Sequence, residues 1–145
     1  MKPEVIIAAF LGTVAFAILY DIPSRYCFVS GLNGMAGWIV YSLLSPSIGE
    51  LGAIFAATLV IALISRYLAV IMKCPEIAFL VSGIFPLVPG AGIYWSAYYL
   101  MAGQMDQAAS TGTGALKTCL ALVLGIAVIH ELPQWMFSGR KNRKR

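Results

Sequence analysis

Long apolar runs, separated by short groups of helix-breaking residues, dominate this chain of 145 residues. Breaks rich in proline, glycine or polar residues fall at 21–25, 45–47, 73–75 and 103–107. A helix needs about 20 residues to cross a hydrocarbon core, and the runs between these breaks are of that order. Only 11% of the residues are charged and 60% are hydrophobic, whereas soluble domains average roughly 25% charged residues. We therefore predict an integral membrane protein with no separate water-soluble domain.

The breaks divide the chain into five candidate spans. We expect one all-α polytopic domain over residues 1–145, with about five transmembrane helices at 3–20, 26–44, 48–72, 76–102 and 108–132. The fourth span contains two prolines and two glycines within seven residues, which favours a helix broken in the membrane. A proline kink that serves only packing is the alternative.

The positive charges predict the orientation of these spans. If the C-terminus is cytoplasmic, eight cations lie on the cytoplasmic side, namely Arg25, Arg66, Lys73 and the five of the basic tail at 138–145. Only Lys2 and Lys117 then lie on the other side. Because cytoplasmic loops carry the excess of Lys and Arg, we expect a multi-pass protein of the cell inner membrane with a cytoplasmic C-terminus.

The second span contains an unusual number of glycines around one amide side chain. Gly31, Gly34 and Gly37 each lower helix propensity, by roughly 1 kcal/mol relative to alanine in water. Small residues let membrane helices approach closely, so a helix-packing face is one interpretation. The other is a thin-walled part of a transport pathway, in which Asn33 offers an amide donor and acceptor inside the bilayer.

The segment from Phe85 to Tyr94, F-P-L-V-P-G-A-G-I-Y, is the strongest local signal. Pro86 and Pro89 remove two backbone donors and strip partners from carbonyls one turn earlier. Non-helical backbone at membrane depth is tolerated where it faces protein or a watery cavity, as at the binding sites of many secondary transporters. Pro86, Pro89, Gly90 and Tyr94 are therefore candidate residues of a substrate pathway.

Lys117 lies about ten residues inside the fifth span, roughly 14 Å below its start. A charge at that depth is a candidate functional group, and here a counter-ion for a substrate. If the helix instead begins near Gly114, Lys117 is an interfacial anchor. The six acidic residues fall near predicted span ends, so no carboxylate at mid-membrane depth is expected in this chain.

Enzyme signatures are absent from the sequence. His130 is the only histidine, so two-histidine metal ligation within one chain is impossible, and neither a phosphate-binding loop nor a nucleophile elbow occurs. The three cysteines lack CxxC spacing and are expected to be packing residues. We predict no catalytic residue, cofactor or metal, and no nucleic-acid partner, because the tail charge is explained by topology.

The order of these features resembles the small subunit of the threonine/serine exporter family. The resemblance rests on Y-D-I-P-S-R-Y at 20–26, G-L-N-G-M-A-G-W at 31–38, C-P-E-I-A-F-L-V-S-G-I-F-P-L-V-P-G at 74–90, and E-L-P before the basic tail. Its most specific element is P-x-x-P-G at 86–90, followed by Tyr94.

The resemblance implies one half of a proton-motive-force-driven secondary exporter of small hydroxy amino acids, working with a larger membrane subunit. Some members of the family export dicarboxylates, so a subunit of a succinate-type exporter is an alternative. A non-transporting membrane scaffold is the rival from another class, and a homo-oligomer is the alternative assembly.

Overall fold

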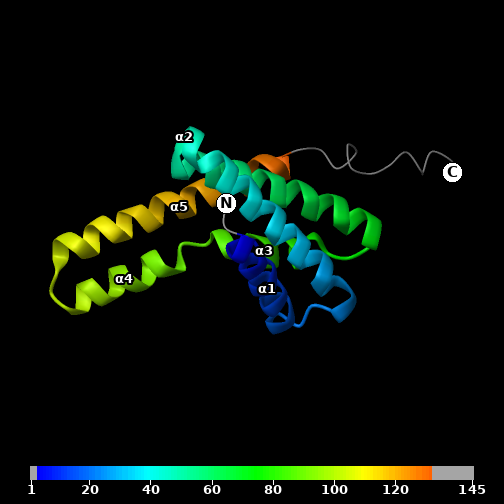
Figure 1. Cartoon of the computed structure of the whole chain (residues 1–145), viewed down its shortest axis with the longest axis horizontal. Coiled ribbons are helices and arrows are strands. Elements are labelled where there is room, and N and C mark those ends of the chain that lie inside the picture. Colours follow the sequence, from blue (N-terminus) through cyan, green and yellow to red (C-terminus); the bar gives the residue numbers. More distant parts are fainter. Residues whose placement is uncertain (1–2, 132–145) are drawn as a thin grey trace.

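The computed structural model describes residues 3–131, and every regular element in that range is helical, as Figure 1 shows. This confirms the all-α fold class for the described part of the chain. The elements are α1 (Pro3–Leu19), α2 (Ser24–Met72), α3 (Glu76–Ile84), the 3₁₀ turn η1 (Phe85–Leu87), α4 (Gly90–Met101) and α5 (Met105–Glu131). The basic tail and Lys2, which contribute to the predicted orientation, lie outside the described residues.

Helix α2 is a hairpin of two helical halves rather than one straight rod. Its backbone leaves the helical conformation at Gly49, with φ 78° and ψ 169°, a region that favours glycine. Pairs of residues equally distant from Gly49 meet across the hairpin: Asn33 with Ser65, and the Tyr26 hydroxyl with the Met72 carbonyl. The sequence places this break at 45–47, whereas the structure continues the helix through Pro46 and interrupts it at Gly49.

Two of the described helices, α2 and α5, are long and apolar enough to cross a membrane by length and composition. The pair α3–η1 and α4 makes a third candidate span if it is counted as one, although it bends by 57° at its break. Helix α1 is also apolar but has only 17 residues.

The helices do not form one uniform bundle. Helices α1 and α3 pack against the α2 hairpin, α5 packs against α2 with its C-terminal part, and α4 packs mainly against α5. In Figure 1 the hairpin of α4 and the first part of α5 extends away from the other helices. Helix α4 accordingly contains no buried residue. The buried apolar cluster lies where α2, α3 and α5 meet, and includes Ile54, Ala57, Ile61, Ala62, Leu80 and Leu122.

A helix that follows a proline, contains a Val-Ser-Gly motif and packs on the preceding helix occurs twice along the chain. Phe-Val-Ser-Gly-Leu at 28–32 returns as Leu-Val-Ser-Gly-Ile at 80–84, and in both copies a proline, Pro23 or Pro75, immediately precedes the helix. Gly31 faces Phe10 of the preceding helix α1, and Gly83 faces Ile61 of the preceding half of α2. The first copy carries Asn33 at the position where the second carries Phe85, the residue before Pro86.

Candidate functional site

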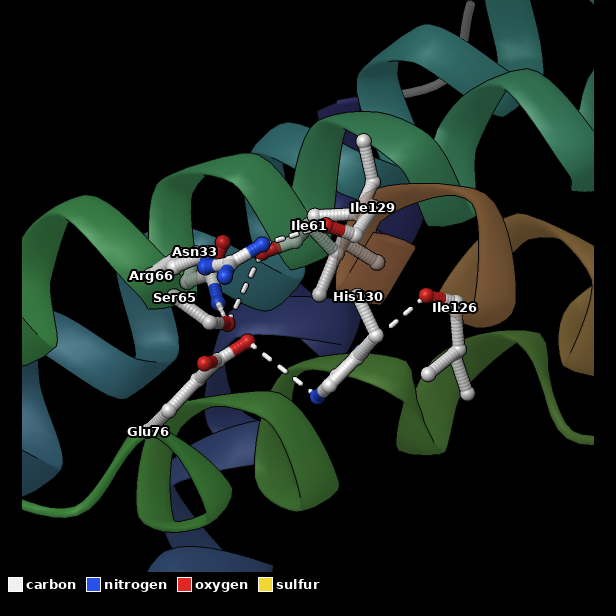
Figure 2. A network of polar contacts seen from close by, with 8 residues as sticks. All are labelled: Asn33, Ile61, Ser65, Arg66, Glu76, Ile126, Ile129 and His130. Carbon is white, nitrogen blue, oxygen red and sulfur yellow. Dashed lines mark hydrogen bonds and ion pairs between the residues drawn. The ribbon is translucent and has the colours of Figure 1, made fainter. Parts of the chain in front are cut away.

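Asn33 is the most deeply buried of the predicted pathway residues, with 1% of its surface exposed. Its amide nitrogen donates to the Ser65 hydroxyl at 2.8 Å, a contact drawn in Figure 2, and to the Phe79 carbonyl at 3.2 Å. The Ser65 hydroxyl in turn donates to the Ile61 carbonyl at 2.8 Å. One amide therefore ties both halves of α2 to the start of the broken helix α3–α4.

Two buried oxygens near these hydrogen bonds of the Asn33 amide nitrogen lack hydrogen-bond partners within the described residues. They are the amide oxygen of Asn33 and the hydroxyl of Ser30, three residues earlier on the same helix. A buried polar group left unpaired costs about 1–3 kcal/mol. The Asn33 amide oxygen and the Ser30 hydroxyl are therefore the unpaired acceptors of this described part of the helix core.

Gly31, Gly34 and Gly37 lie where helices approach most closely. A Cβ at Gly31 would lie 2.6 Å from side-chain atoms of Phe10 and Val14 on α1. A Cβ at Gly34 would overlap the Thr13 hydroxyl, and one at Gly37 would overlap Ile61 across the α2 hairpin. All three positions therefore require the absence of a side chain for close helix packing.

Gly34→Ala tests this packing role. Because the added methyl group overlaps Thr13, which is fully buried, we expect a loss of stability of about 1–3 kcal/mol. The measurement is the temperature at which half of the detergent-solubilised protein stays monodisperse. Gly12→Ala is the matched control, since a Cβ there meets nothing within 4 Å. Equal midpoints for the two variants would contradict a tight contact at Gly34.

Gly83 and Gly125 make similar close contacts that the sequence analysis did not single out. A Cβ at Gly83 would lie 2.8 Å from the Asn33 amide nitrogen and 2.9 Å from Ile61. At Gly125 on α5 it would lie 2.8 Å from Thr58. Isolated glycines in apolar runs carry little signal, although the repeated Val-Ser-Gly motif marks Gly83 as the counterpart of Gly31.

The proline- and glycine-rich segment changes the course of the chain. Helix α3 ends at Ile84, η1 follows, Val88 is extended with φ −65° and ψ 130°, and α4 begins at Gly90. Leu87 is buried in the core, and the Phe85 ring stacks on Phe16 of α1. The first part of the break is therefore packed against the other helices.

The structure does not bring all predicted pathway residues together. Asn33, on α2, lies beside Phe79 and Gly83. These two residues belong to α3, the helix that leads into Pro86. Pro86 and Pro89 are half-buried, whereas Gly90 is exposed and Tyr94 on α4 is 64% exposed. The core site thus contains Asn33 and the entry to the break, while Tyr94 lies on an outer surface.

Lys117 also lies on an outer surface. It is the thirteenth of the 27 residues of α5, and Leu116, Leu120 and Leu124 are exposed around it. The helix begins at Met105, nine residues before Gly114, so the lysine is at the centre of the helix rather than near its end. The lysine side chain is therefore not part of the helix core.

A second polar network joins the ends of three helices, as Figure 2 shows. The Arg66 guanidinium, 7% exposed, donates to the Ile129 carbonyl in the last turn of α5. The carboxylate of Glu76, in the first turn of α3, lies beside the His130 ring, with 3.7 Å between Oε1 and Nε2. The sequence analysis treated Arg66 as a topological charge and considered His130 only as a metal ligand. The network joins residues more than 50 positions apart.

A groove of about 740 Å³ is lined by residues of α4 and α5, beside the contact between these two helices. Its walls are almost entirely small or apolar, and they include Ser96, Ala108, Gly112, Ala115 and Cys119. The Ser96 hydroxyl is already satisfied, since it donates to the Ala108 carbonyl at 2.9 Å. None of the predicted pathway residues lines this groove.

Comparisons with known proteins identify the family. No curated protein and no solved structure matches the chain. The family model described as "Threonine/Serine exporter, ThrE" matches residues 5–131, which include the α2 hairpin, the broken helix and α5. The family match and the apolar helices support the predicted assignment as a membrane protein of amino-acid export. The chain therefore belongs to the threonine/serine exporter family.

Proposed function

We propose that this chain is the small membrane subunit of a secondary exporter of small carboxylate-bearing metabolites, of the threonine/serine type. The family match over residues 5–131 is the observation that carries the proposal. The chain acts with a larger membrane subunit, because the family resemblance implies a transporter divided between two chains. Succinate-type dicarboxylates are the alternative substrates.

Five membrane segments fit the described helices when α2 is divided at Gly49. Each half of α2 is then long enough for a bilayer about 30 Å thick, as are α5 and the α3–α4 pair. Helix α1, with 17 residues, is at the lower limit. In this arrangement the protein lies in the inner membrane with its C-terminus in the cytoplasm, in accord with the cation bias.

The substrate pathway runs past the α2–α3 contact at Asn33 and along the boundary with the partner. The unpaired oxygens of Asn33 and Ser30 support a role as acceptors of hydrogen bonds from a substrate ammonium or hydroxyl group. The exposure of Lys117 supports a pathway wall shared with another chain, where the lysine meets the substrate carboxylate. Bending at the Pro86–Gly90 break changes the distance between these two regions.

A vesicle assay with purified subunits tests the function. The chain alone, the larger subunit alone and both together are reconstituted, and transport of labelled serine, threonine and succinate is measured across an imposed proton gradient. We expect transport of serine or threonine at least about tenfold above either subunit alone only when both are present. Full activity of this chain alone would contradict the two-subunit proposal and favour a homo-oligomer.

A scaffold role is the second candidate. One observation favours it: each of Gly31, Gly34 and Gly37 is accounted for by close packing, without recourse to a pathway. A scaffold predicts that variants change transport only in proportion to the amount of assembled complex. A transporter subunit predicts variants that assemble normally and transport slowly.

A further inference from the structure

A groove of about 580 Å³ opens at the end of the α2 hairpin that lies farthest from Gly49. It lies between two connections of the chain, 21–23 before α2 and 73–75 before α3. Three charged residues line it: Arg25, Lys73 and Asp21. The lining therefore carries two positive charges and one negative charge, and most of its other residues are apolar.

The two connections that frame the groove share backbone features at both of their ends. Each begins with a residue in the left-handed region, Asp21 at φ 55° and Lys73 at φ 51°. Each ends with a proline of nearly identical geometry, Pro23 at φ −50° and ψ 133°, and Pro75 at φ −56° and ψ 132°. Neither proline supplies a side-chain cap, so the two helix starts add partial positive charge beside the two cations.

Two contacts involve charged residues near these helix starts. Glu76, in the first turn of α3, pairs with His130 and is not part of the groove lining. The Arg25 guanidinium lies 4.5 Å from the centre of the Tyr26 ring, which holds it by a cation–π contact. The groove thus presents two positive charges and one opposing carboxylate.

An apolar track leads from this charged end along α3. Ile77 and Val81, one turn apart, both line the groove and are 66% and 39% exposed. The track runs from the chain connections, where a membrane interface is expected, toward the middle of the helices. Positive charge at an interface followed by an apolar groove between helices is the shape and chemistry of a site for an anionic lipid.

We propose that this groove binds one anionic phospholipid, with its phosphate between Arg25 and Lys73 and one acyl chain along Ile77 and Val81. The net charge of the lining, +1, matches a headgroup with a single negative charge, such as phosphatidylglycerol. The lipid bridges the two equivalent connections and so holds α1, the α2 hairpin and α3 in register. This site is separate from the proposed substrate pathway and does not depend on which metabolite is exported.

Native mass spectrometry of the full chain tests the proposal, with its larger subunit bound where the two co-purify. The protein is exposed to equimolar phosphatidylglycerol, phosphatidylethanolamine and phosphatidylcholine, and the retained lipids are counted. We expect about a fivefold or greater preference for the first retained phosphatidylglycerol. The double variant Arg25→Gln, Lys73→Gln should reduce this preference to within about twofold, whereas Lys117→Gln, which removes one positive charge elsewhere, should leave it unchanged.

Asp21→Asn separates binding from folding defects, because removing the opposing carboxylate should increase phosphatidylglycerol retention by about two- to fivefold. A damaged fold cannot produce that gain. Glycerol phosphate, which has the headgroup charge without acyl chains, should not displace the lipid. Equal retention of the three lipids by the wild-type protein, no response to the double variant, or displacement by glycerol phosphate would each overturn the proposal.

Discussion

Replacing Pro86 and Pro89 together with alanine is expected to lower export per assembled complex by about tenfold or more, while stability holds or rises. The native backbone passes from α3 through a 3₁₀ turn and an extended residue, Val88, before α4 begins at Gly90. Alanine restores two backbone donors and removes two rings that oppose helix formation, a change of about 3 kcal/mol for each proline in a helix interior. The 57° bend between the two helices should then decrease.

The reason for a transport loss is geometric. The entry to the break is tied to Asn33 through Phe79, and its Phe85 ring stacks on α1. A straightened α3–α4 would move α4 and the hairpin it forms with α5 relative to this core. The measurement is the export rate divided by the amount of assembled complex in the membrane.

Pro46→Ala provides the matched control, because Pro46 already lies within the helical part of α2. It should leave the ratio of export to assembly within about twofold of wild type, since removing a proline that the helix already accommodates changes little. If the double variant also keeps the wild-type ratio, the break has only a packing role and the scaffold function gains support.

Much of the fold follows from local signals in the sequence. Breaks rich in proline, glycine or polar residues at 21–23, 73–75 and 103–104 follow the ends of α1, α2 and α4. Proline and glycine interrupt helices, and polar residues are stable at a membrane surface. The turn inside α2 does not follow so simply. Pro46 is the stronger breaker by type, yet Gly49 takes the left-handed backbone that the turn requires.

The interactions within the site depend on contacts distant in sequence. Nothing local to Asn33 indicates that its amide binds Ser65 and Phe79, 32 and 46 positions away. The pairing of Glu76 with His130 likewise requires the start of α3 to meet the end of α5. The repeated Val-Ser-Gly motif is visible in the sequence, but only the packing of Gly31 and Gly83 on their preceding helices gives it structural meaning.

The structure refines the predicted position of Lys117 within its helix. The sequence places the lysine inside a span, and the structure centres it in α5, roughly 18 Å from the start of the helix and 21 Å from its end at 1.5 Å per residue. Snorkelling spans only part of that distance. A charged side chain at the bilayer centre costs about 2.5–3.5 kcal/mol or more, so a compensating partner is expected.

That partner is not provided by the described part of this chain. The described acidic residues lie at helix ends or, for Glu50, beside the α2 turn. Because Lys117 is exposed, we propose that its counter-charge comes from another molecule. In the proposed export function, this molecule is the substrate, whose carboxylate meets the lysine at the boundary with the proposed larger subunit.

Lys117→Met is therefore expected to leave assembly intact and to lower export per assembled complex by about tenfold, the equivalent of about 1.4 kcal/mol of lost interaction. Removing a charge from a lipid-depth surface carries no folding penalty, so the loss reflects the missing attraction for the carboxylate. Lys117→Arg keeps the charge with different geometry and should lose only part of the rate. Leu120→Met, one turn away on the same exposed surface, should match wild type. If Lys117→Met also matches wild type, the lysine only anchors or packs α5.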